Sequence, residues 1–180
     1  MIAITPTHKI LLAALVLVAA VYDIRFRKIP NWLCATGIAA GLALNGFIFE
    51  WPGLAQAALG LGVAALIYLP LFVLRAMGAG DVKLMMAVGS LVGWKSWLAI
   101  FVITGILGGV IALLLLLSKG LLGEKMGNVV YILKELVHLR APYRSRPDMD
   151  VRSPTAIRLP HAAVIALGAL SFLTLVVVLG

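Results

Sequence analysis

Two short polar stretches hold the residues that could do chemistry. Residues 78–83 read Gly-Ala-Gly-Asp-Val-Lys, so Asp81 and Lys83 interrupt a chain that is 63% hydrophobic and only 12% charged. Asp23 ends an earlier apolar run and opens the second stretch, 23–31. A glycine turn with Asp81 as a helix cap would explain the first stretch alone. Because ionisable groups at membrane depth are costly and usually face a cavity, the presence of both stretches favours a functional site.

The chemistry available to two such carboxylates is hydrolysis by activated water. Two carboxylates held close together cannot both ionise, so they share a proton. Such a pair can deprotonate a water molecule and polarise a peptide carbonyl without a metal or a covalent intermediate. We expect Asp81 to be the ionised member, because a helix N-terminus and the nearby Lys83 would stabilise its charge, and Asp23 to hold the proton. The same two residues could instead relay protons or ions in a carrier.

The remaining reactive side chains do not suggest a metal or cofactor. The single cysteine, Cys34, lies in an apolar run and can form neither a disulfide framework nor a thiolate site. His138 and His161 are far apart in the sequence, and neither has a second histidine at ligand spacing. We therefore expect no metal and no cofactor.

The elements that must position these residues are membrane helices. A mean hydropathy of +1.10 over 180 residues, with several long apolar runs, predicts an all-α polytopic membrane protein that forms one domain, residues 1–180. We expect about six spans, at residues 10–22, 32–49, 54–74, 84–92, 98–117 and 160–178. The fourth span is only half a membrane thick.

Local signals refine this arrangement. Residues 50–53, Glu-Trp-Pro-Gly, predict a tight turn. Two glycine pairs spaced by four residues predict close helix packing: Gly37 with Gly41, and Gly105 with Gly109. Between 118 and 159 the composition changes, and apolar residues at helical spacing predict an amphipathic helix on the membrane surface.

The distribution of basic residues predicts the orientation. All but Lys9 and Lys95 of the 15 Lys and Arg residues fall on the side of the first loop. Because Lys and Arg accumulate in cytoplasmic loops, this side is expected to be cytoplasmic, with Asp23 and Asp81 at that face and both termini external. The same rule accounts for the net charge of +8 without a nucleic-acid partner.

The two polar stretches also resemble a known family. Tyr22-Asp23-Ile24-Arg25 with Arg27-Lys28-Ile29-Pro30-Asn31-Trp32, and Gly78-Ala79-Gly80-Asp81-Val82-Lys83, resemble the two signature motifs of the type IV prepilin peptidases. These are membrane aspartic proteases that remove the basic leader of pilin precursors at the cytoplasmic face. The resemblance implies that Asp23 and Asp81 are catalytic. It also implies that the second motif is shaped by Lys83, Gly78 and Gly80, and that the first is supported by Arg25 and Asn31.

The resemblance extends to Pro160 before the last span, although His161 stands where the family usually has an aromatic residue. Long members carry an amino-terminal methyltransferase domain with paired Cys-x-x-Cys motifs, whereas this chain has one cysteine. The resemblance therefore implies the short, protease-only branch that serves tight-adherence (Flp-type) pili. We expect an inner-membrane endopeptidase acting on a pilin-like precursor. A proton- or ion-coupled carrier and a non-catalytic component of a secretion platform are the alternatives.

Overall fold

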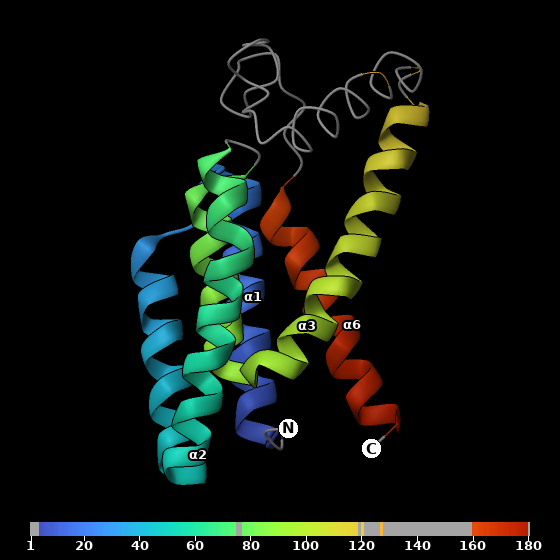
Figure 1. Cartoon of the computed structure of the whole chain (residues 1–180). Coiled ribbons are helices and arrows are strands. Elements are labelled where there is room, and N and C mark those ends of the chain that lie inside the picture. The colour runs from blue at the N-terminus through green and yellow to red at the C-terminus, as the bar shows by residue number, and fades with distance from the viewer. Residues whose placement is uncertain (1–3, 75–76, 119, 121–126, 128–159, 180) are drawn as a thin grey trace.

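The described part of the chain is entirely helical. The computed structural model describes residues 4–74, 77–118, 120, 127 and 160–179. Within them the chain forms α1 (Pro6–Phe26), α2 (Asn31–Val73), α3 (Ala79–Ser118) and α6 (His161–Leu179), as Figure 1 shows. The all-α prediction is confirmed for these residues. The predicted surface helix within 118–159 lies outside the described residues.

Helices α2 and α3 each consist of two arms. Glu50, with φ 55° and ψ −143°, interrupts α2, and the helix folds back on itself there (Figure 1). This break lies in the predicted turn at residues 50–53. Gly93, with φ 72° and ψ 167°, interrupts α3 in the same way. The first arm of α3 therefore includes the short predicted span 84–92 and begins five residues before it.

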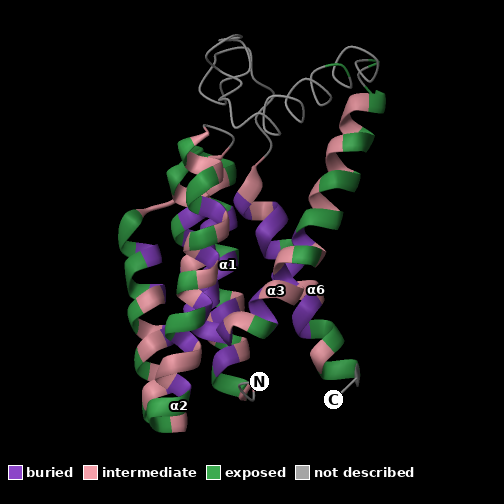
Figure 2. Ribbon diagram, viewed as in Figure 1, coloured by how far each residue is buried: buried purple, intermediate pink, exposed green. Residues whose placement is uncertain are grey.

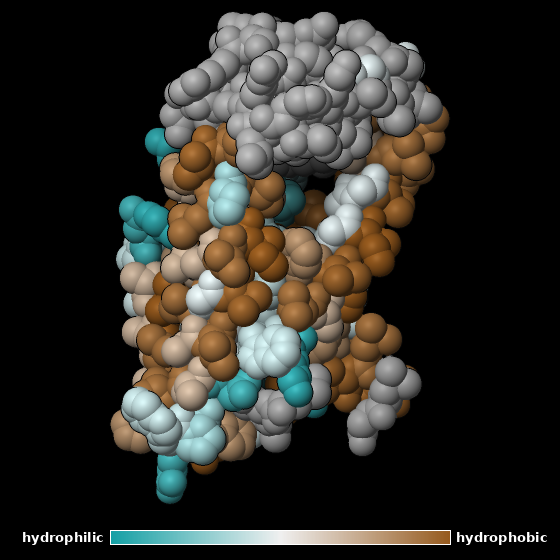
Figure 3. Space-filling model, in the orientation of Figure 1, coloured by the Kyte–Doolittle hydropathy of each residue, from teal (hydrophilic) through white to brown (hydrophobic). Residues whose placement is uncertain are grey.

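The surface of the helices is strongly apolar. Three of the described helices are long and apolar enough to cross a membrane: α2, α3 and residues 161–178 of α6. Large hydrophobic side chains are exposed along them, including Phe47, Leu66 and Ile106. Figure 3 shows hydrophobic side chains over most of the helical surface in view, with hydrophilic ones toward its two ends. Such a surface suits helices that face lipid rather than water.

The core forms where α3 packs against its neighbours. Helix α2 packs mainly against α3, and α6 packs against both α1 and α3. Buried residues line these contacts, as the purple segments of Figure 2 show. The fully buried side chains include Trp97 and Met85, and the Trp97 indole donates a hydrogen bond to the Met85 carbonyl at 3.0 Å.

One of the two predicted glycine contacts is confirmed. A Cβ added at Gly41 would lie 2.7 Å from the carbonyl carbon of Ser90, so a side chain at this position would force α2 away from α3. The prediction for Gly105 and Gly109 is wrong for the described residues, because an added Cβ at either would meet nothing within 4 Å. Gly108 instead faces α6, where a Cβ would lie 3.3 Å from Val164.

A buried polar cluster ties three helices together. The fully buried Asn45 of α2 donates its amide hydrogens to the carbonyls of Gly41, Ser90 and Leu91 at 2.9–3.1 Å. Its amide oxygen lies 3.2 Å from Nε2 of the buried His8 in α1. Ser90 and Leu91 lie in the last turn before the break at Gly93, and the last carbonyls of a helix have no partner within it, so Asn45 caps the first arm of α3.

Candidate active site

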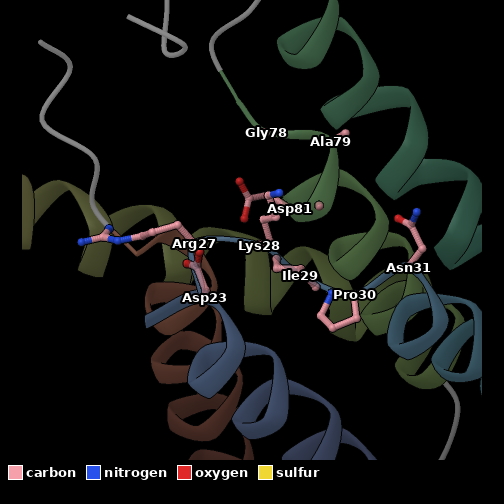
Figure 4. Close-up of a pocket in the computed structure, with 10 residues that line it drawn as sticks. Asp23, Arg27, Lys28, Ile29, Pro30, Asn31, Gly78, Ala79 and Asp81 are labelled. Atoms are coloured by element: carbon pink, nitrogen blue, oxygen red, sulfur yellow. The ribbon is translucent and has the colours of Figure 1, made fainter. Parts of the chain in front are cut away.

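The candidate site lies where three helices end or begin together. Helix α1 ends, and α3 and α6 begin, at the end of the bundle opposite the N and C labels in Figure 1. Asp23 lies in the last turn of α1, and Asp81 lies in the first turn of α3. Both carboxylates line one pocket of about 480 Å³, and they point into it in Figure 4. The structure thus brings together Asp23 and Asp81, the two acids that the sequence indicates as reactive.

The glycines of the second stretch allow Asp81 its position. The Val82 amide donates to the Gly78 carbonyl at 3.4 Å, so Gly78 caps α3, and the Asp81 carboxylate accepts a hydrogen bond back from the Gly78 backbone. This exchange satisfies two groups at the helix start. A Cβ at Gly80 would lie only 3.1 Å from Cβ of Ile29, so the absence of a side chain lets the two stretches pack together.

Asp23 is held by two different helices. Its backbone carbonyl accepts a hydrogen bond from the Arg27 amide at 2.9 Å, where Arg27 adopts a left-handed conformation with φ 54° and ends α1. Its side-chain Oδ2 accepts a hydrogen bond from the backbone amide of Ala162 at 3.0 Å, across 139 residues of sequence. Ala162 was not among the predicted site residues. Pro160 marks the start of the last helix in the sequence, but no local signal indicates which amide faces Asp23.

Lys83 and Asn31 join the two stretches directly. The Lys83 ammonium donates a hydrogen bond to the Asn31 side-chain oxygen at 2.9 Å. From the sequence, Lys83 is expected to stabilise the charge of Asp81, whereas in the structure its ammonium bonds Asn31. Arg25 is exposed, and it is Arg27 and Lys28 that supply positive charge to the pocket lining.

A second, apolar pocket adjoins the first. It has a volume of about 490 Å³ and shares Asn31 and Ala79 with the carboxylate pocket. Most of its lining is hydrophobic, with Lys83 at the polar side: Asn31, Cys34, Ala35, Ile38, Leu69, Phe72, Ala79, Val82, Lys83 and Met86. The two pockets therefore place a polar and an apolar surface side by side.

The charges around the pocket suit water activation by a carboxylate pair. Asp23 lies close enough to Asp81 for their charges to interact. It also interacts electrostatically with His161, the first residue of α6. Among the described residues no group of three or more His, Cys, Asp or Glu side chains could hold a metal ion. Two carboxylates that share a pocket can exchange a proton with each other and with a water molecule bound between them.

The fold and the site together define a helical protein with apolar helices long enough to cross a membrane and an aspartate pair at one end of the bundle. Residues 10–113, which include both aspartates, match the type IV leader peptidase family (Peptidase_A24). The chain belongs to this family, and the resemblance drawn from its two motifs is confirmed.

The chain is also similar to a prepilin leader peptidase from a bacterium. The chain is 28% identical over 130 residues to the prepilin leader peptidase/N-methyltransferase of Myxococcus xanthus (strain DK1622). The alignment covers 66% of this chain but only 38% of that relative. No solved structure matches the chain.

Proposed function

We propose that this protein is a membrane aspartic endopeptidase that removes the leader peptide of type IV pilin-like precursors at the cytoplasmic face of the inner membrane. The observation that carries the proposal is the shared pocket of Asp23 and Asp81 in a chain of the leader peptidase family. The precursor is then the protein partner, and the lipid bilayer surrounds the apolar helices.

In the proposed reaction, a water molecule binds between the two carboxylates, which share one proton. The ionised carboxylate takes a proton from the water while the protonated one hydrogen-bonds to the scissile carbonyl oxygen. The water oxygen bonds to the carbonyl carbon, the C–N bond breaks, and the leaving nitrogen receives a proton from the pair. The pair ends the cycle with one shared proton, so neither a metal nor a covalent intermediate is required.

The remaining predicted residues support this site without reacting. Gly80 permits the close approach of the two stretches, and Gly78 leaves room for the Asp81 carboxylate. The bond between Lys83 and Asn31 links α2 to α3 beside the pocket. Arg25 belongs to the basic loop that supports a cytoplasmic location for this face.

The decisive experiment incubates purified protein with a pilin precursor and measures the shortened product. Asp23→Asn and Asp81→Asn should each abolish cleavage, because an amide neither accepts a proton from water nor shares one. The double variant should be no worse than either single one, since residues that act as a unit fail together. Glu50→Gln, which neutralises an exposed acid at the break in α2, is the matched control and should retain activity.

The outcomes separate this proposal from its alternatives. Near-normal cleavage by Asp23→Asn would refute the paired-carboxylate mechanism even if Asp81 proved essential. A wild-type protein that leaves the precursor intact, in a preparation where a known peptidase cleaves it, would favour a carrier or a non-catalytic component of a secretion platform.

A further inference from the structure

One hydrogen bond to Asp23 comes from outside the two signature stretches. Oδ2 of Asp23 accepts a hydrogen bond from the amide of Ala162 at 3.0 Å, and Ala162 is the second residue of α6. Ala162 itself is fully buried, whereas Asp23 lines the pocket.

The geometry of α6 leaves this amide free to bond outside its own helix. The first amides of a helix have no carbonyl partner one turn earlier. In α6 the next two amides turn back to the Pro160 carbonyl, Ala163 at 3.1 Å and Val164 at 3.4 Å. The Ala162 amide instead points to Asp23. One amide in the first turn of α6 therefore donates to the Asp23 carboxylate rather than to a carbonyl of its own chain segment.

Asp23 and Asp81 differ in where the donor to each carboxylate comes from. Asp81 lies in the first turn of α3 and accepts a hydrogen bond from the Gly78 backbone just before that helix. Asp23 lies in the last turn of α1, where the backbone amides bond carbonyls one turn earlier in the same helix. A backbone donor to its carboxylate therefore comes from another element, and that donor is the Ala162 amide of α6.

The packing of α6 fixes this donor in place. A Cβ at Gly168 would lie 2.9 Å from the Thr104 Cα, so α6 and α3 touch along their backbones. Ile165 and Ala169 are fully buried in the core formed with the neighbouring helices. The distance between Ala162 and Asp23 is therefore set by rigid helix contacts rather than by a loop.

We propose that the Ala162 backbone amide is a positioning group of the active site, which holds Oδ2 of Asp23 and so fixes the orientation of its carboxylate. Helix α6 then supports the site alongside α1 and α3, the two helices that carry Asp23 and Asp81. This inference rests on the proposed function of Asp23 and adds a group that the two signature motifs do not contain.

The test removes the N–H while keeping the side chain. Ala162 is replaced by its α-hydroxy analogue, lactic acid, through nonsense suppression, which turns the amide into an ester. The matched control is the same replacement at Ala163, whose amide donates only to the Pro160 carbonyl in the contacts described above. Precursor cleavage is then measured as separate kcat and KM values for both variants and the wild type.

The expected result is a loss of kcat with KM unchanged, because the Asp23 carboxylate reacts with water and does not bind the precursor. Loss of the hydrogen bond that orients this reacting group should lower kcat about ten- to a hundredfold in the Ala162 ester. The Ala163 ester should leave both constants unchanged. The other charged or titratable groups near Asp23 are the same in all three proteins: Asp81, His161, Arg27 and Lys28.

A second variant guards against failure of the ester protein to fold. Ala162→Pro also removes the N–H, and proline is tolerated in the first turn of a helix, with Ala163→Pro as its control. An unchanged kcat in the Ala162 variants, an equal loss in the Ala163 controls, or an effect on KM alone would overturn the inference. A wild-type protein without peptidase activity would instead refute the proposed function itself.

Discussion

Two glycines on the second arm of α2 provide a matched test of how tightly the helices that carry the site are packed. An added Cβ at Gly60 would collide with the carbonyl oxygen of Gly89 and lie 2.8 Å from its carbonyl carbon. Two residues further along the same arm, an added Cβ at Gly62 would meet nothing within 4 Å. The same chemical change, glycine to alanine, thus has opposite steric consequences at the two positions.

The magnitudes follow from this difference. Alanine is favoured over glycine in a helix interior by about 1 kcal/mol, so Gly62→Ala should raise the free energy of unfolding by up to that amount. Gly60→Ala gains the same term but must push α2 and α3 apart, and overpacking costs about 1–3 kcal/mol. The displaced arm of α3 also carries Asp81. A misplacement of about 1 Å at reacting groups can lower the rate about a hundredfold.

The assay combines denaturant unfolding in detergent with precursor cleavage. Gly62→Ala should be at least as stable as the wild type and equally active, while Gly60→Ala should be less stable and lose most of its activity. If Gly60→Ala matched Gly62→Ala in both measurements, the close backbone approach of α2 and α3 at Gly89 would be wrong.

Three further predictions concern single features. Lys83→Met removes the bond to Asn31 and should lower kcat/KM about fivefold, the equivalent of about 1 kcal/mol. Asn31→Leu should have a similar effect. In a double-mutant cycle, the double variant should show little additional loss. Glu50→Gly relieves a backbone conformation that favours glycine and should raise the free energy of unfolding by about 1 kcal/mol; no change in denaturant midpoint would argue against strain at the break. EDTA should leave precursor cleavage unchanged, because the carboxylates activate water themselves; loss of activity that zinc restores would contradict this mechanism.

Local sequence signals were sufficient for the features that depend on nearby residues. Asp23 and Asp81 stood out because a carboxylate at the end of an apolar run is costly unless it has a use. The turn at residues 50–53 was predictable from Pro52 and Gly53, and the helical class from the long apolar runs.

Contacts between residues far apart in the sequence could not be predicted from such local signals. Nothing near Ala162 indicates that its amide bonds a carboxylate 139 residues away, because every helix start has free amides. The spacing of Gly105 and Gly109 shows that one helix face is small, but it does not show that a neighbour packs there. The bond between Lys83 and Asn31 likewise depends on how α2 meets α3, which neither motif encodes alone.

The Asn45 cluster has a consequence for how the protein assembles during synthesis. Helix α2 emerges from the ribosome and enters the bilayer before α3, so Asn45 arrives before the carbonyls of Ser90 and Leu91 that it will bond. Its amide can bond the Gly41 carbonyl within α2, but the second hydrogen has no acceptor in hydrocarbon until α3 follows. The first arm of α3 in turn ends at the break at Gly93, so its last carbonyls need a hydrogen-bond donor from outside that arm. Before they meet, α2 and the first arm of α3 therefore each carry a polar group that only the other one satisfies. This favours a single register in the pairing of the first arm of α2 with the first arm of α3.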